Sequence, residues 1–324
     1  MTSKKINPFL FYSKQLQSLF TKAATQKDPA SWLYKNNVRT PLFMLEALTR
    51  LHKSAFDESL FVKWNKRFKK LEDLLGEIDK YSVFEKEFKS NKKISGDING
   101  YFQANIDKYT GKLNERLRKK DWLGDKLKKF DDQLSEFTVE YNDEYINELK
   151  FSIVDEVDAI LDFVSKFDGQ FTKLEEQVHE VRRKLRWLSI YAQALQGLIQ
   201  LKKSTGSKKA VLHYQTKSVL NSPFNKLPPK PKGTAIILFD ASSFYAISWL
   251  INELGELKDD GLRIEELKKA ICSAEDITEI HAREKAIAFL GFKKTKETDI
   301  LKKTSEIITT AIAKDKVLDT LLIA

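Results

Sequence analysis

Four basic side chains follow one another at helical spacing in the second half of the chain. They are His179, Arg182, Arg183 and Arg186, which we call the second-half stripe. Intervals of i, i+3, i+4 and i+7 bring all four heads to one side of a helix. Like charges gathered over two turns raise the free energy unless a counter-charge is present. Because arginine forks fit phosphate oxygens and histidine adds a switchable donor, the stripe predicts an anion site.

Carboxylates are the alternative counter-charge for this stripe. Glu175 precedes His179 by four residues, and Glu180 precedes Lys184 by four, so pairing within the helix is available. Carboxylates from other helices would complete the neutralisation. The spacing alone leaves both possibilities open.

A comparable set of cations, the first-half stripe, repeats the same four intervals. It consists of Lys63, Lys66, Arg67 and Lys70. These residues flank the apolar seam of a predicted helix, in which aromatic and leucine residues recur every three or four positions. If the two halves of the chain face each other, the two stripes would converge on one groove.

The whole chain of 324 residues carries a formal charge of +10, which favours polyanionic partners. Much of the excess lies between residues 202 and 234, where eight lysines occur without an acid. Glycines and prolines also gather there, so this segment is predicted to be a loop. It is interpreted either as a polyanion contact or as a solvated, partly disordered insertion.

The sequence lacks the motifs of several functional classes. No glycine-rich phosphate loop, no His-Glu-x-x-His and no nucleophile elbow is present. Cys272 is the single cysteine, which excludes an internal disulfide. No signal-peptide core and no run of about 18 apolar residues occurs, so a cytoplasmic protein without a membrane span is expected. No enzyme activity, metal or cofactor is predicted.

Scarce glycine and proline and abundant lysine, glutamate and leucine predict an all-α fold. Asn7-Pro8 precedes the first periodic segment, and Gly291 is expected to end a helix. Apolar periodicity predicts helices over 8–27, 31–54 with a kink at Pro41, 57–80, 81–90, 98–132, 135–168, Phe171–Lys203, 240–258, 261–273, 276–290 and 294–321.

The run Thr234–Phe239 is the one segment with strand character. A single strand has no partner, so we interpret it as a buried lead-in to the following helix. Asp240 is the predicted N-cap of that helix.

A weak internal repeat accompanies these helices. Leu75-Gly76-Glu77-Ile78 recurs as Leu254-Gly255-Glu256-Leu257, each time at the end of an apolar-seamed helix. The first-half stripe has no basic counterpart in the repeat, since its equivalents are Ser242, Tyr245, Ala246 and Trp249. The repeat predicts two related helical halves, 1–168 and 169–324, together forming one domain.

With these features the chain resembles the CHAD family, the conserved histidine α-helical domain. The family's His-x-x-Arg helix is similar to the segment from Val178 to Trp187, and its Leu-Gly-x-x-x-Asp segment matches residues 254–259. In the first half, Asn36 and Arg39 stand where that histidine and arginine are expected, so Arg39 alone is kept.

The resemblance implies two pseudo-symmetric four-helix bundles with basic side chains lining a channel between them. It also implies inorganic polyphosphate as ligand and no catalytic activity. The predicted function is therefore a polyanion-binding module. The alternative is a helical protein-interaction scaffold in which the anion site has decayed. Nucleic-acid binding ranks lower because no recognised module is present.

Overall fold

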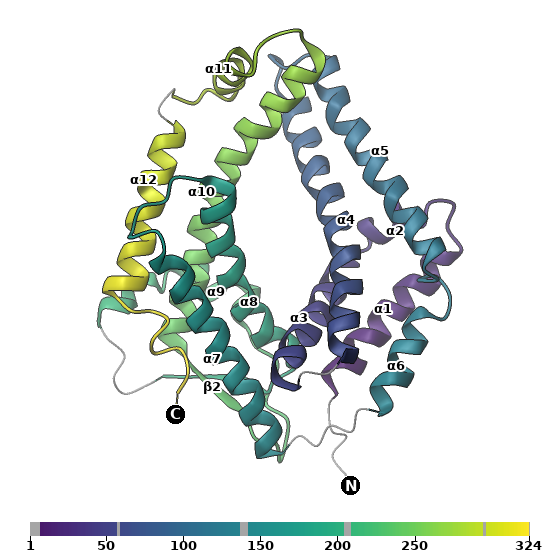
Figure 1. The fold of residues 1–324 in the computed structure, drawn as a ribbon, viewed down its shortest axis with the longest axis vertical. Coiled ribbons are helices and arrows are strands. Elements are labelled where there is room, and N and C mark those ends of the chain that lie inside the picture. Colours follow the sequence, from purple (N-terminus) through teal and green to yellow (C-terminus); the bar gives the residue numbers. More distant parts are fainter. Residues whose placement is uncertain (1–6, 57–58, 137–141, 204–208, 294–295, 324) are drawn as a thin grey trace.

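The computed structural model describes residues 7–56, 59–136, 142–203, 209–293 and 296–323 (Figure 1). These residues are predominantly helical, which confirms the all-α prediction at this coarse level. The α-helices are α1 (Pro8–Ala24), α2 (Pro29–Lys35), α3 (Arg39–Phe56), α4 (Ser59–Lys89), α5 (Gly96–Lys119), α6 (Lys126–Glu136), α7 (Asp143–Ser165), α8 (Glu180–Ala194), α9 (Lys217–Asn221), α10 (Ala241–Ala274), α11 (Glu279–Leu290) and α12 (Lys296–Ile308).

Short elements complete the described chain. The strands are β1 (Ile199–Lys202) and β2 (Ile237–Asp240). Leu174–His179 and Thr309–Lys314 are π-helical turns, and Lys209–Tyr214 and Pro223–Asn225 are 3₁₀ turns.

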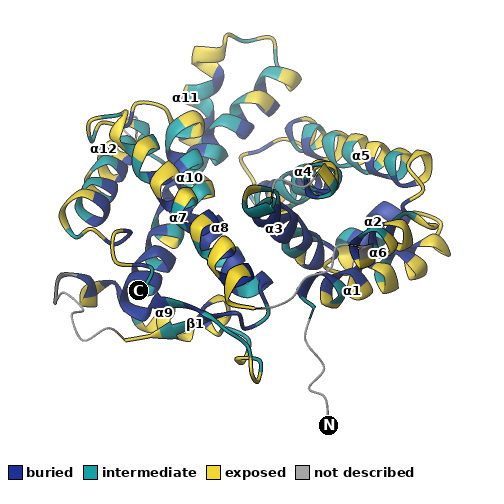
Figure 2. Cartoon of the chain, turned by 60° about the horizontal axis from the view of Figure 1, so that its bottom comes forward, coloured by how far each residue is buried: buried dark blue, intermediate teal, exposed yellow. Residues whose placement is uncertain are grey.

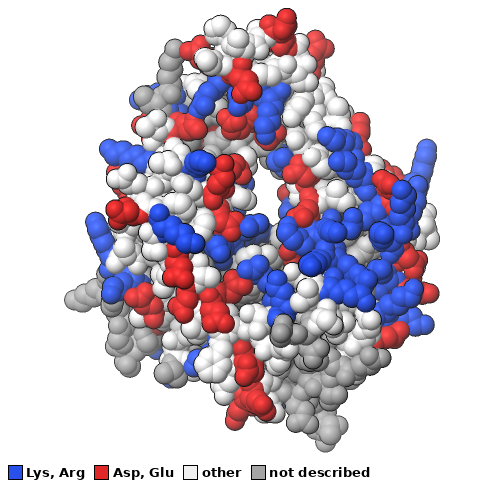
Figure 3. All heavy atoms as spheres, in the orientation of Figure 1, with Lys and Arg blue, Asp and Glu red and all other residues white. Residues whose placement is uncertain are grey.

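Figure 1 shows α1–α6 on one side of the molecule and α7–α12 on the other. Helix α3 packs on α8 at one end, and α5 packs on α10 at the other. The main apolar core joins Leu45 and Leu48 of α3 to Leu185 and Leu188 of α8. Between the two junctions the surface is hollowed (Figure 3). Exposed residues lie along the outer faces of helices such as α5 and α11 (Figure 2).

The helix ends follow local capping chemistry. Asp240 caps α10 as predicted, since its Oδ1 accepts a hydrogen bond from the Ser243 amide at 2.9 Å. Gly291 ends α11 in the left-handed conformation at φ 69°, also as predicted. Further N-cap side chains that accept backbone hydrogen bonds are Asn7, Asp28, Ser95, Asn142, Thr216 and Thr278.

Two predicted helix boundaries were wrong because a single residue turns the backbone. The segment 31–54 is interrupted at Asn37, whose φ of 55° ends the helical run. Pro41 then lies in the first turn of α3. Backbone amides in the first turn have no acceptor within the helix, so a proline there costs no hydrogen bond and the helix is not kinked. Asp121, with φ 58°, likewise separates α5 from α6.

Two other predicted breaks do not occur. Helix α4 runs unbroken through residue 81, and α10 runs unbroken through Gly261. Leu174 occupies the space that a side chain at position 261 would need. The glycine therefore serves close packing rather than a helix end.

The long basic helix predicted over Phe171–Lys203 is three elements. A π-helical turn runs from Leu174 to His179, α8 ends at Ala194, and β1 follows. Gln196 and Gly197 have φ values of 48° and 91°, which reverse the chain direction after α8. Periodicity predicted one helix because Ile199, the first residue of β1, continues the leucine spacing by chance.

The expectation that Thr234–Phe239 lacks a strand partner was also wrong. β2 pairs in parallel with β1, with Ile199 opposite Ile237. Leu322 forms an isolated antiparallel bridge to Phe239 on the other side. These partners are remote in sequence, so local reasoning does not find them.

The lysine-rich segment 202–234 is more ordered than a solvated loop over the part that the structure describes. Val211, Tyr214, Val219 and Asn225 are buried, and Asn225 Nδ2 donates to Ser248 Oγ at 2.9 Å. Residues 204–208 lie outside the described residues. The segment thus packs on α10 through its apolar members.

The division at residue 168 stays a prediction. Helix α7 packs on both α3 and α8, and Figure 1 shows it on the same side of the molecule as α8 and α10. In space, the change from one helix group to the other therefore falls between α6 and α7. Among the described residues, no helix is both long and apolar enough to cross a membrane.

Candidate functional site

Arg39, the one basic residue predicted to survive at the first-half site, starts α3 and is held by two carboxylates of α4. Its Nη2 lies 2.6 Å from Glu72 Oε1, and its Nη1 lies 2.5 Å from Asp79 Oδ2. The guanidinium also lies 3.6 Å from the position of a Cβ at Gly76. Two ion pairs therefore fix its orientation and offset its charge.

Arg182, in α8, is held differently. Its Nε donates to the Ile251 carbonyl of α10 at 3.0 Å. The guanidinium lies over Gly255, only 3.0–3.3 Å from where a Cβ would stand. No carboxylate lies within ion-pair distance of Arg182 in the described part of the chain. Both arginines thus lie against the glycine of a Leu-Gly-Glu segment, Arg39 at Gly76 and Arg182 at Gly255.

These two glycines offer a matched prediction. Gly76→Ala meets ordinary van der Waals contact and is expected to raise the free energy of unfolding by up to about 1 kcal/mol, since alanine favours helix. Gly255→Ala requires the Arg182 guanidinium to give way by a few tenths of an ångström while its Nε is bonded to the Ile251 carbonyl, so we expect it to be about 1 kcal/mol less stable than Gly76→Ala. Urea unfolding of both variants measures the contrast. Equal stabilisation by both would contradict the packing of Arg182 on Gly255.

Arg186 lies between the two helix groups. Its guanidinium carbon is 4.7 Å from the ring centroid of Phe43, and Arg39 is 5.4 Å from the same ring. Burial lowers the pKa of Arg186, as do Arg182 and Arg39, whereas Glu72 and Glu46 act to raise it. We call Arg39, Arg182 and Arg186 the central arginine cluster.

The remaining members of the second-half stripe differ in environment. His179 has a buried Nδ1 with no hydrogen-bond partner among the described residues. Burial, with Lys258, Arg182 and Arg183 nearby, lowers the pKa of His179 to about 4, so the ring is neutral at pH 7. Arg183 is exposed and pairs with Glu180 at 2.7 Å.

The first-half stripe is not gathered in one place. Lys63 and Arg67 line a pocket that α4 forms with α6. Lys66 lies near Lys53 of α3 and contributes to the lowering of the Lys53 pKa, after burial and Arg50. Lys70 is exposed. Figure 3 shows lysines and arginines on both sides of the central hollow, most densely over α4–α6.

Among the described residues, most of the predicted site residues have no carboxylate within ion-pair distance. Within the described ranges, only Arg39 and Arg183 of the nine lie within 4.0 Å of a carboxylate oxygen. The other seven are His179, Arg182, Arg186, Lys63, Lys66, Arg67 and Lys70. Pairing with carboxylates, the alternative raised by the sequence, therefore accounts for a minority of the cations.

Sequence reasoning missed the acids of the site. Glu46 is buried in α3, with an exposed fraction of 5%, and its Oε2 has no partner among the described residues. Burial, then Glu72, raises the pKa of Glu46 to about 7. Glu46 falls within the helix predicted over residues 31–54, but nothing in its spacing with Glu72 indicated that the two carboxylates interact.

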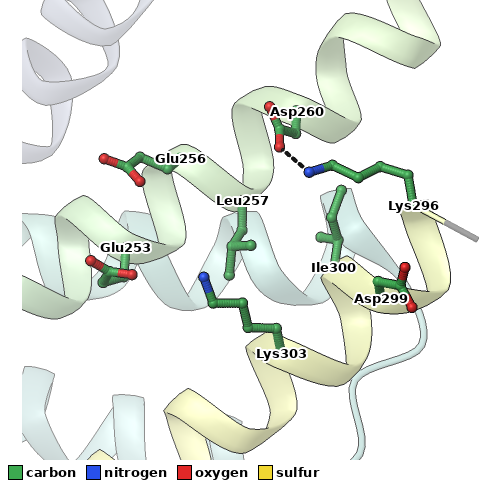
Figure 4. A pocket seen from close by; sticks show the side chains of 8 residues that line it. All are labelled: Glu253, Glu256, Leu257, Asp260, Lys296, Asp299, Ile300 and Lys303. Atoms are coloured by element: carbon green, nitrogen blue, oxygen red, sulfur yellow. Dashed lines mark ion pairs between the residues drawn. The ribbon is translucent and has the colours of Figure 1, made fainter. Parts of the chain in front are cut away.

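A second pocket, of about 190 Å³, lies between α10 and α12 (Figure 4). It mixes acids with lysines, and Lys296 Nζ lies 2.6 Å from Asp260 Oδ2. Lys303 extends from α12 toward α10 in the same view. No group of three or more His, Cys, Asp or Glu residues that could hold a metal ion occurs in the described ranges. The pocket's charges are thus partly satisfied internally.

The fold and the site together define a class: a helical protein with a cationic cluster between two groups of helices. Comparison with protein-family models, with curated protein sequences and with solved structures finds no match for this chain. The CHAD resemblance therefore stays a prediction.

Proposed function

We propose that this protein binds a polyanion, without catalysis, at the central arginine cluster, with inorganic polyphosphate as the favoured ligand. The observation that carries the proposal is Arg186. It is a half-buried arginine beside Arg39 and Arg182, with no carboxylate in ion-pair distance in the described part of the chain. We also propose that the protein is located in the cytoplasm.

The free energy of the unliganded cluster supports this choice. A partly buried charge without a paired counter-ion is costly, and Phe43 offsets only a part of that cost through its ring face. An anion between Arg182 and Arg186 would supply the missing counter-charge and accept bidentate hydrogen bonds. His179 would contribute its unpartnered Nδ1. The binding should weaken with salt, as expected when phosphates displace counterions.

The same residues support a duplicated, CHAD-like architecture. Arg39 and Gly76 in α3 and α4 have the same relation as Arg182 and Gly255 in α8 and α10. We infer that the two helix pairs descend from one unit, of which the first half keeps Arg39 and has Asn36 where the histidine is expected. The polyphosphate assignment rests on this resemblance, whereas the anion assignment rests on the cluster itself.

Removing the unpaired arginines tests the proposal. The variant Arg182→Gln/Arg186→Gln is expected to bind long-chain polyphosphate at least about tenfold more weakly at roughly physiological salt. Isothermal titration calorimetry gives the affinity, and thermal melting reports folding. The control Arg118→Gln/Lys302→Gln loses the same charge from two exposed positions on α5 and α12. Equal affinities for both variants would refute a site at the cluster.

The second candidate is a protein-interaction scaffold, which the ion pairs favour. Arg39 is already neutralised by Glu72 and Asp79, and Arg50 joins α3 to Glu156 of α7 at 2.8 Å. In this case the cluster only stabilises the contacts between helices. The scaffold predicts that the cluster variant and the charge-matched control bind long-chain polyphosphate equally weakly, and that a single-stranded oligonucleotide behaves the same way.

A further inference from the structure

A separate pocket of about 270 Å³ lies between α4 and α6, apart from the central arginine cluster. Its basic lining comes from two helices, with Lys63 and Arg67 on α4 and Lys126 and Lys129 on α6. Trp64 forms part of its wall. The sequence predicted the α4 members as part of a central groove and missed the α6 members.

The pocket has a surplus of positive charge. Among the described residues that line it, Asp132 is the one acid. Lys129 lies 3.8 Å from Asp121, but that pair is well exposed, so water screens it. Lys63, Arg67 and Lys126 have no carboxylate within 4.0 Å over the described residues. Burial lowers the pKa of Arg67, and burial with Arg67 and Lys129 lowers the pKa of Lys126. The four cations thus repel one another, and Asp121 and Asp132 offset only a part of this repulsion.

The geometry of the pocket selects for a phosphate group rather than a base. Arg67 lies 4.5 Å above the ring centroid of Trp64, and the Trp64 side chain is fully buried. Trp64 Nε1 donates to Gln133 Oε1 at 2.9 Å, which fixes the ring. No face of this ring is left for a nucleobase to stack on. Lys126 is the first residue of α6, so the positive end of the helix dipole adds to the field.

We propose that this pocket binds a compact phosphate anion, with inorganic diphosphate as its representative ligand. The two α4 cations and the two α6 cations would contact the two phosphate groups from opposite walls. Arg67, held flat by Trp64, supplies the fork that suits paired phosphate oxygens. The terminal phosphates of a longer chain carry the same chemistry. The site is independent of the proposed function at the central arginine cluster.

Calorimetric titration of the full chain with sodium diphosphate tests this proposal. We expect one binding event that weakens at least about tenfold in Lys63→Gln/Lys129→Gln. The matched control, Lys86→Gln/Lys128→Gln, removes two exposed lysines from the same two helices. Melting curves establish that each variant is folded, and the affinity of the control should remain within about twofold of the parent.

The cluster variant Arg182→Gln/Arg186→Gln separates the two sites. If the pocket is the diphosphate site, this variant keeps diphosphate affinity even when it loses long-chain polyphosphate. Loss of diphosphate binding in the cluster variant, with retention in the pocket variant, would overturn the pocket and leave the proposed function standing. Equal losses in the pocket variant and its control, or no diphosphate binding by the parent, would also overturn it. Competition between diphosphate and long chains in the cluster variant's background, where the pocket is intact, distinguishes chain ends from free diphosphate.

Discussion

Glu46→Gln is expected to raise the free energy of unfolding at pH 8 by about 3 kcal/mol. Glu46 is almost fully buried, and its pKa is raised to about 7 by burial and then by Glu72. In the unfolded chain this carboxyl ionises near its ordinary value, so the folded state holds its proton more tightly. The free energy of unfolding therefore falls as the pH rises through the pKa of Glu46 in the folded protein. Glutamine has the shape of the protonated acid and avoids that loss.

The pH dependence identifies the cause. At pH 5 the buried carboxyl is protonated, so the advantage of glutamine should shrink to about 1 kcal/mol. His52 acts in the opposite sense: burial lowers its pKa to about 4, so it removes stability as pH falls from its unfolded pKa through that value. The quantity to compare is therefore the difference in the free energy of unfolding between variant and parent at the same pH. The contribution of His52 is equal in both proteins and cancels in this difference.

An exposed carboxylate supplies the control for this prediction. Glu144→Gln, at the start of α7, changes the same charge at an exposed position and should stay within about 0.5 kcal/mol of the parent. Urea unfolding at pH 5 and pH 8 measures all three proteins. A gain for Glu46→Gln that is the same at both pH values would show that its ionisation is not responsible.

Gly197→Ala is expected to lower the free energy of unfolding by about 2–4 kcal/mol. Gly197 has φ 91°, a conformation that residues with a side chain rarely adopt. A Cβ there would also meet the backbone carbonyl of Pro229, which cannot rotate away as a side chain can. The loop around Pro229 must then move, and it adjoins the start of β1, where Gln200 Nε2 donates to the Pro228 carbonyl at 3.0 Å.

Gly291→Ala is the matched control for this backbone effect. Gly291 has φ 69° as the cap of α11, but no heavy atom lies within 4 Å of a Cβ there. It should cost only the left-handed conformation, about 1–2 kcal/mol. Chemical unfolding of the two variants separates backbone strain from collision. Equal costs would mean that the approach of Pro229 to Gly197 contributes nothing.

Local chemistry was sufficient for much of the secondary structure. Caps such as Asp240 and Gly291 act on neighbouring amides and carbonyls, so their effect is readable from adjacent residues. The apolar seam of α4 likewise identified Phe61, Trp64 and Phe68 as core, and all three are fully buried. The predicted helix ends were wrong where a single residue with positive φ, such as Asn37 or Asp121, interrupts the helix.

The sequence by itself determined a predominantly helical, basic protein and the spacing of its cations along each helix. Only the tertiary structure decided which cations meet, because a meeting between helices depends on packing across remote segments. In the folded chain, Arg186 lies near Arg39 and Arg182, with Glu46 and Glu72 close by. Lys63 and Arg67 instead lie in the pocket between α4 and α6. Periodicity fixes the face on which a side chain lies, whereas the neighbour of that face is set by the burial of apolar surface across the whole chain.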